Sequence, residues 1–231
     1  MREFFSLDGP FNKYGGFLAD TLVLSLMWLL FSIPIVTIGA ATSAMFYVST
    51  RRIAEREGYI TADFWLAFKA NFKRATLLWL LLFVAGGIIA LNIWLLTTEA
   101  INTEAVGIMG LFILPAQFIF GLQLIFMSIY MFPITARFEM GFVQTIKSSF
   151  IMANRHFLTT VVCAGLLFAV IIVGMATGFL ILAAPGVYAM LSSYLIMRIF
   201  KRYRPEMDKD PRLEIAEIEA QKSQKQKEPP Q

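Results

Sequence analysis

Four long windows of the sequence contain no Asp, Glu, Lys or Arg, and this feature restricts the fold more than any other. The windows are 21–50, 75–98, 105–136 and 156–197. Each reaches or exceeds the roughly 20 apolar residues that cross a bilayer as an α-helix. Transmembrane strands would instead show short segments of alternating hydropathy. The chain is therefore predicted to be an all-α, polytopic transmembrane helical bundle whose immediate partner is the lipid bilayer.

The basic residues follow these windows and form no domain of their own. Hydrophobic residues make up 58% of the chain and charged residues 16%, against roughly 45–50% and 25% in soluble domains. The net charge of +4 comes from Lys and Arg that flank the apolar windows, which is the distribution expected of cytoplasmic loops. We therefore expect no nucleic-acid partner.

Two short segments inside the apolar windows predict chain reversals. "SIPIVTIG" at 32–39 and "APG" at 184–186 contain proline and glycine, which mark reversals and are unfavourable inside helices. Division of the first and last windows at these points gives six helices, among them 17–33, 40–57, 159–182 and 187–203. In an alternative with five helices the first window is one kinked helix, because its 30 residues are few for two crossings.

The distribution of Lys and Arg favours six helices over five. In the six-helix arrangement the turns at 34–39, 97–107 and 183–186 contain no Lys or Arg. Both termini then lie in the cytoplasm, with the protein in the plasma membrane as a multi-pass chain. Five helices would place Arg2 and Lys13 outside. Residues 1–205 are thus expected to form the transmembrane domain, and 206–231 a charged, disordered cytoplasmic tail.

The segment "GYITADFWLAFKANFKRA" at 58–75 mixes charged and aromatic residues between two apolar windows. Phe64, Phe68 and Phe72 share one face at helical spacing, so the segment predicts an amphipathic helix on the cytoplasmic leaflet. A shift of 83 residues aligns it with "GFVQTIKSSFIMANRHFLT" and indicates a parallel duplication. Asn71 and Asn154 occupy matching positions and are interpreted as N-caps of the spans that follow.

The chain offers little chemistry for catalysis. It contains one histidine, His156, and one cysteine, Cys163, without a converging acid–base set or a recognised nucleotide or zinc motif. We therefore expect no enzyme activity, no cofactor and no metal. Asn92, Gln117 and Gln123 lie inside apolar windows, where amides commonly form interhelical hydrogen bonds but also mark transport sites.

Other features of the apolar windows are read as packing elements. Pro115 is expected to kink or interrupt its helix, and "GMATG" at 174–178 matches the small-residue spacing of closely packed helices. For the function, the absence of a catalytic set favours a non-enzymatic accessory or scaffold protein, and the alternative is a small solute transporter or channel.

The most charged cytoplasmic loop supplies the candidate interaction surface. Its members are Arg51, Arg52, Asp63, Trp65, Lys69 and Arg74. Aromatic and arginine side chains are the usual anchors of protein interfaces. Basic and aromatic residues at this depth also bind anionic lipid headgroups, and both interpretations stay open.

Two segments resemble the YesL family of small bacterial integral membrane proteins. They are "FNKYGGFLADTLVLSLMWLLFSIPIVTIGAATSAMFYV" and "ITADFWLAFKANFKRATLLWLL". The resemblance covers most of residues 4–200, and its most specific parts are Pro34–Gly39 and Asp63–Asn71. It implies an accessory protein associated with carbohydrate uptake, with a sugar importer or a sensor as partner. It implies no catalytic residues.

Overall fold

The computed structural model describes residues 10–54, 58–98 and 104–203, and these residues are almost entirely helical, without a strand. The described α-helices are α1 (Pro10–Ser32), α2 (Ile38–Ile53), α3 (Ile60–Thr97), α4 (Glu104–Arg137), α5 (Phe142–Arg155), α6 (Phe157–Thr177) and α7 (Ala184–Tyr203). Two short 3-10 helices, η1 (Ile35–Thr37) and η3 (Phe179–Leu182), lie in the connections. The predicted all-α class is confirmed. The predicted tail at 206–231 lies outside the described residues.

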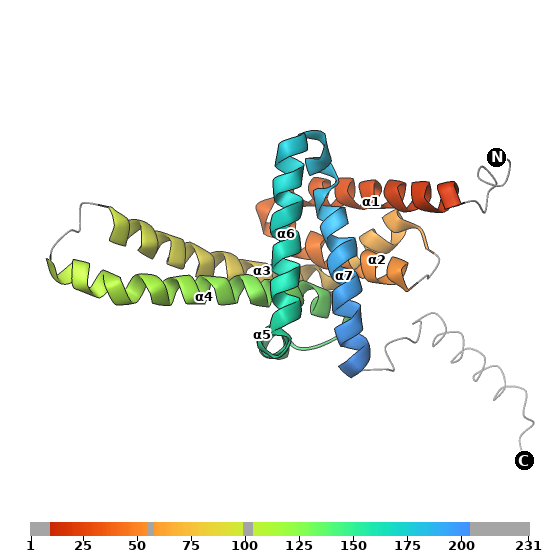
Figure 1. Ribbon diagram of the computed structural model, residues 1–231. Coiled ribbons are helices and arrows are strands. Elements are labelled where there is room, and N and C mark those ends of the chain that lie inside the picture. The colour runs from red at the N-terminus through yellow and green to blue at the C-terminus, as the bar shows by residue number, and fades with distance from the viewer. Residues whose placement is uncertain (1–9, 55–57, 99–103, 204–231) are drawn as a thin grey trace, which may run out of the picture.

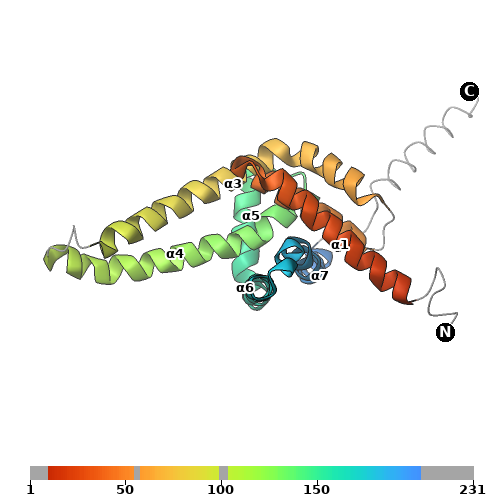
Figure 2. The same ribbon diagram turned by 90° about the horizontal axis from the view of Figure 1, so that it is seen from above.

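The helices do not run as one parallel bundle. In Figure 1, α3 and α4 lie side by side as a long hairpin whose outer part extends away from the other helices. Helices α6 and α7 pack against each other and run across the direction of this hairpin. Figure 2 looks nearly along α6 and α7 while α3 and α4 lie across the view. The architecture is therefore a packed base with a two-helix arm.

Helix α2 forms the centre of the packed base. It contacts α1, α3, α4 and α7, and the residues of its first half are small and buried: Gly39, Ala40, Ala41, Ser43 and Ala44. A Cβ atom on Gly39 would overlap the Ala75 carbonyl oxygen and the Trp79 Cβ. Small residues let helix backbones approach closely, which is the usual basis of helix packing in membranes.

Four helices are long and apolar enough to cross a membrane, so the chain has the character of a membrane protein. Their apolar segments are Gly15–Ser32, Ile60–Thr97, Phe112–Arg137 and Phe157–Thr177. Helices α2 and α7, which the sequence predicted to be the two further crossings, are not among them. Helix α2 also ends in Arg51 and Arg52 and is buried among protein. The six-helix count is not confirmed.

The first predicted reversal is confirmed and the second lies a few residues away from its predicted position. Helix α1 ends at Ser32, and the Thr37 hydroxyl donates to the carbonyl oxygens of Phe31 at 2.6 Å and Pro34 at 2.7 Å. In the last window the chain turns at Gly178, whose φ of 64° favours glycine. "APG" at 184–186 instead forms the first turn of α7, where a missing proline N–H costs nothing.

Helix α3 corrects the prediction of a separate interfacial helix at 58–75. It runs without interruption from Ile60 to Thr97, so that segment is its first half. The interpretation of Asn71 and Asn154 as N-caps is also wrong. The Asn71 Oδ1 accepts from Arg74 at 3.2 Å inside α3, and the Asn154 Nδ2 donates to the Phe150 carbonyl oxygen at 2.8 Å inside α5.

The two copies of the predicted duplication differ in structure. The first forms part of one continuous helix, whereas the chain breaks at His156 between α5 and α6 in the second. The duplication is therefore not confirmed. Pro115 likewise does not interrupt its helix, because α4 is continuous through both Pro115 and Pro133. Gly174 packs against Ile181 of η3, which directly follows α6 in the chain, so the role of "GMATG" between helices stays a prediction.

Candidate functional site

A buried ion pair joins the end of α2 to the start of α3. The Arg51 Nη1 donates to the Asp63 Oδ1 at 3.0 Å, and each residue is only 8% exposed. Gly58 lies directly against this pair, because a Cβ atom on Gly58 would overlap the Asp63 Oδ2. Loss of one partner from a buried ion pair costs about 3–5 kcal/mol. These two predicted surface residues thus connect helices in the interior.

Arg52, the next residue of the candidate set, connects α2 to α1. Its guanidinium forms an ion pair with the Asp20 carboxylate, and both side chains are partly exposed. Partly exposed pairs are screened by solvent and contribute at most about 1 kcal/mol. Arg52 therefore reaches the surface while it is engaged within the chain.

Arg74 binds the backbone at and just after the end of α4 through hydrogen bonds. Its guanidinium donates to the carbonyl oxygens of Thr135 at 3.0 Å, Phe138 at 3.0 Å and Met140 at 2.6 Å. The last carbonyl groups of a helix have no partner within the helix and carry partial negative charge. Arg74 satisfies such groups and fixes the connection between α4 and α5.

Arg137 has a comparable role that sequence reasoning missed. Its Nε donates to the Thr50 Oγ1 at 3.0 Å, and its Nη2 lies 3.4 Å from the Met197 Sδ. It thereby links α4 to α2 and α7. The signal in the sequence was its place as the first charged residue after the window 105–136, but its contacts depend on the tertiary packing.

Trp65 and Lys69 are the members of the candidate set that face outward from α3. Trp65 is 45% exposed, and the Lys69 Nζ lies 5.0 Å from the centre of its ring. The ring stacks on Phe68 at 5.9 Å, which holds it in one orientation. Tyr59 and Leu66 nearby are 84% and 60% exposed. The structure therefore splits the six predicted residues into internal links and an outward aromatic–basic pair.

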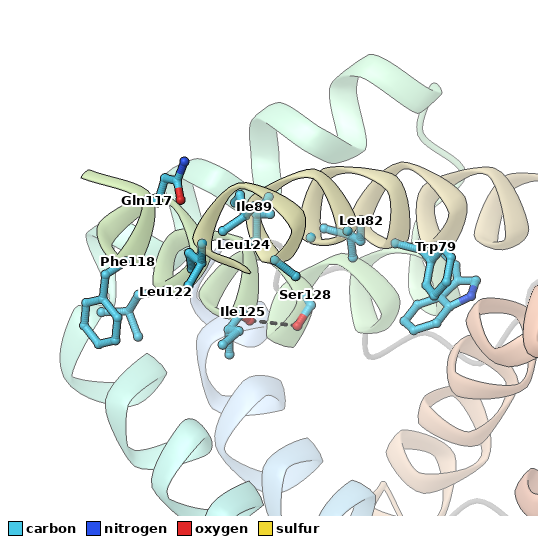
Figure 3. Close-up of a pocket in the computed structure, with 15 residues that line it drawn as sticks. Trp79, Leu82, Ile89, Gln117, Phe118, Leu122, Leu124, Ile125 and Ser128 are labelled. Carbon is cyan, nitrogen blue, oxygen red and sulfur yellow. Dashed lines mark hydrogen bonds between the residues drawn. The ribbon is translucent and has the colours of Figure 1, made fainter. Parts of the chain in front are cut away.

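An apolar groove of about 630 Å³ lies between the outer halves of α3 and α4. Figure 3 shows lining side chains from both helices, with Trp79 and Gln117 far apart along the groove. The dashed line in Figure 3 is the hydrogen bond from the Ser128 Oγ to the Ile125 carbonyl oxygen, at 2.7 Å. The Gln117 Oε1 and the Trp79 Nε1 have no hydrogen-bond partner among the described residues.

The three amides of the apolar windows do not converge. Gln117 lines the groove, whereas Asn92 and Gln123 do not. The Asn92 Nδ2 donates to the Ile88 carbonyl oxygen at 3.0 Å on the exposed side of α3. Over the described ranges no three His, Cys, Asp or Glu side chains are close enough to hold a metal ion. The groove thus has the apolar character of a lipid or small-molecule site and carries few polar groups.

A second charged site lies at the junction of α5 and α6. The His156 Nε2 lies 3.0 Å from the Tyr203 hydroxyl, and the Arg155 guanidinium carbon lies 5.4 Å from the centre of the Tyr203 ring. Burial, followed by the positive charges of Arg155 and Arg202, lowers the pKa of His156 below its usual value. The junction therefore favours the neutral imidazole.

Comparison with known proteins gives one match. The model of a family described as a protein of unknown function, DUF624, matches residues 21–93, about a third of the chain. No curated protein and no solved structure matches. The matched residues comprise most of α1, all of α2 and most of α3. They include the Arg51–Asp63 pair, Trp65, Lys69 and Arg74, but the match does not confirm the YesL resemblance.

Proposed function

We propose that this protein is a non-enzymatic accessory or scaffold component of a membrane assembly. The proposal rests on the different contacts made by the charged and aromatic residues near the start of α3. Arg51, Asp63 and Arg74 connect helices, while Trp65 and Lys69 remain outward as a pre-oriented pair. Aromatic rings held by their neighbours lose little entropy when a partner covers them, which suits them to anchor an interface.

The partner class rests on the YesL resemblance and on the distribution of basic residues. The resemblance implies a sugar importer or its sensor. The resemblance also implies a bacterial plasma membrane. The basic residues favour both termini in the cytoplasm, so that Trp65 and Lys69 meet the cytoplasmic side of the partner.

A crosslinking pulldown from native membranes tests this proposal. Wild-type protein is expected to recover a transporter or a sensor kinase in stoichiometric amount. Trp65→Ala should reduce that recovery about tenfold or more, because truncated interface anchors commonly cost 2 kcal/mol or more. Trp94→Ala is the matched control, since Trp94 lies at the far end of the same helix and is 60% exposed. Equal recovery with both variants would contradict the proposal.

A small solute transporter or channel is the second candidate, and the groove on the α3–α4 arm favours it. Its volume of about 630 Å³ lies within the usual range of ligand pockets, roughly 300–1,000 Å³. The unpartnered Gln117 Oε1 supplies one polar group for orientation of a solute. Solute flux from the purified protein alone in liposomes, abolished by Gln117→Leu, would support transport and overturn the accessory role.

A further inference from the structure

Positive charge gathers at the junction of α5 and α6, where the most apolar of the candidate spans begins. Arg155 is the last residue of α5, His156 lies at the break, and α6 starts at Phe157. The end of α7 contributes Arg202 and Tyr203 to the same place. Residues far apart in the sequence thus form one site, which we call the junction site: Arg155, His156, Arg202 and Tyr203.

Contacts within the junction site hold its parts together. The His156 Nε2 and the Tyr203 hydroxyl are 3.0 Å apart, and the two rings meet edge to face at 5.6 Å between centroids. Arg155 lies over the face of the Tyr203 ring, in the geometry of a cation–π contact. Both Arg155 and Arg202 act electrostatically on the imidazole. Arg155 and Arg202, which precede His156 and Tyr203 in the sequence, therefore flank this contact from α5 and from α7.

Among the described residues no ion pair involves either of these two arginines. The ion pairs of the described ranges join Asp63 to Arg51 and Asp20 to Arg52, and neither carboxylate is paired with Arg155 or Arg202. Exposed cations that flank one contact attract an anion. Arginine is suited to this role because its planar guanidinium binds phosphate oxygens in a bidentate manner.

The surroundings of the junction site identify the source of the anion. Phe157 and Leu158, the next two residues of the chain, are 56% and 82% exposed. Large apolar side chains exposed directly beyond cations are typical of the boundary between headgroups and acyl chains. A soluble acidic peptide would satisfy the arginines but leave these apolar side chains in contact with water.

We propose that the junction site binds the headgroup of an anionic phospholipid. Arg155 and Arg202 donate to its phosphate oxygens, and its acyl chains lie against Phe157 and Leu158 at the start of α6. The site would tie the α6–α7 pair to one leaflet of the membrane. This proposal is independent of the partner surface at Trp65 and Lys69, which lies on another helix.

The only histidine of the chain makes the site directly measurable. The pKa of His156 would be followed by NMR of the imidazole in nanodiscs of phosphatidylcholine alone and of equimolar phosphatidylcholine and phosphatidylglycerol. A negative bilayer surface of roughly −30 to −50 mV raises the pKa of any exposed imidazole there by about half to one unit. A bound phosphate within reach of the ring should add at least about one unit more.

Two variants separate the bound lipid from the general surface potential. An Arg155→Gln/Arg202→Gln double variant should show only the smaller shift between the two lipid compositions. Lys147→Gln, which removes an exposed cation two turns earlier in α5, should retain the full shift. Equal shifts in the wild type and the double variant would overturn the proposal. The assignment to lipid would also fail if inorganic phosphate raised the pKa equally in phosphatidylcholine nanodiscs.

Discussion

The base around α2 and the outer arm of α3 and α4 differ in opposite directions in composition and in burial. The base is rich in small, hydroxyl-bearing and charged residues, yet most side chains of α2 are buried. The arm is the more apolar region, yet none of the α3 residues from Trp79 to Thr97, and none of residues 112–125 in α4, is buried. In lipid, apolar side chains gain nothing from leaving the solvent, so close packing and polar contacts decide where helices meet.

Helix α3 passes through both regions and makes the comparison direct. Its first half is fixed by Asp63, Phe64, Ala67 and Ala75, which are all buried. Its second half exposes Val84, Ile88, Leu91 and Trp94. Mutations of the same chemical type should therefore have large effects in the base and small effects on the arm.

The largest effect is expected at the buried ion pair. Asp63→Asn should lower the free energy of unfolding by about 3–5 kcal/mol, because it removes the carboxylate charge from a buried ion pair with Arg51. Asp20→Asn, which breaks the partly exposed pair with Arg52, is the matched control and should cost at most about 1 kcal/mol. Denaturant titration of the purified protein in detergent measures both. Equal costs would remove the distinction between a buried and an exposed pair.

Loss of the Arg74 contacts should be the next largest effect. Arg74→Gln removes a charged donor from three carbonyl oxygens at the end of α4, and hydrogen bonds to charged groups contribute about 1.5–3 kcal/mol. The same denaturant titration should show a loss of about 2 kcal/mol. Lys73→Gln is the neighbouring control, since Lys73 is exposed. A loss of similar size with Lys73→Gln would show that charge alone, and not the geometry of Arg74, stabilises α4.

Substitution of one glycine in the base and one in the arm compares the space that each region leaves for a methyl group. Gly39→Ala places a methyl group on the Ala75 carbonyl oxygen, and such overpacking costs about 1–3 kcal/mol. Gly87→Ala meets no atom within 4 Å and should leave stability unchanged or raise it by about 1 kcal/mol through helix propensity. Thermal unfolding of the two variants side by side tests the pair. Destabilisation by Gly87→Ala would mean that another chain or helix covers the arm.

The smallest effect is expected at the amide of the groove. The Gln117 Oε1 has no partner among the described residues, so Gln117→Leu should change the free energy of unfolding by about 0.6 kcal/mol or less. Denaturant titration measures this value as well. A loss near 2 kcal/mol would indicate that Gln117 binds a group that the described residues do not include.

The sequence allowed the helical class and most helix positions to be predicted, because charge-free windows and the Pro34 break are local signals. The continuity of α3 was missed, since a run of charged residues at 69–74 was taken to separate a surface helix from a span. Of those charges, Arg74 makes tertiary contacts at the end of α4. Lys69 lies over Trp65 of the same helix, and Lys73 is exposed. The candidate site could be located around the connection between α2 and α3, but only the packing assigns Asp63 to the interior and Trp65 to the surface.

The contrast between base and arm is tested most directly by quenching of tryptophan fluorescence with brominated acyl chains. The chain has four tryptophans, and single-tryptophan variants with the others changed to Phe would retain either Trp94 or Trp28. Trp94 on the arm is 60% exposed, whereas the Trp28 Nε1 donates to the Thr42 hydroxyl at 3.0 Å between α1 and α2. In nanodiscs Trp94 should be strongly quenched and Trp28 weakly. Equal quenching of both, or stronger quenching of Trp28, would contradict the account.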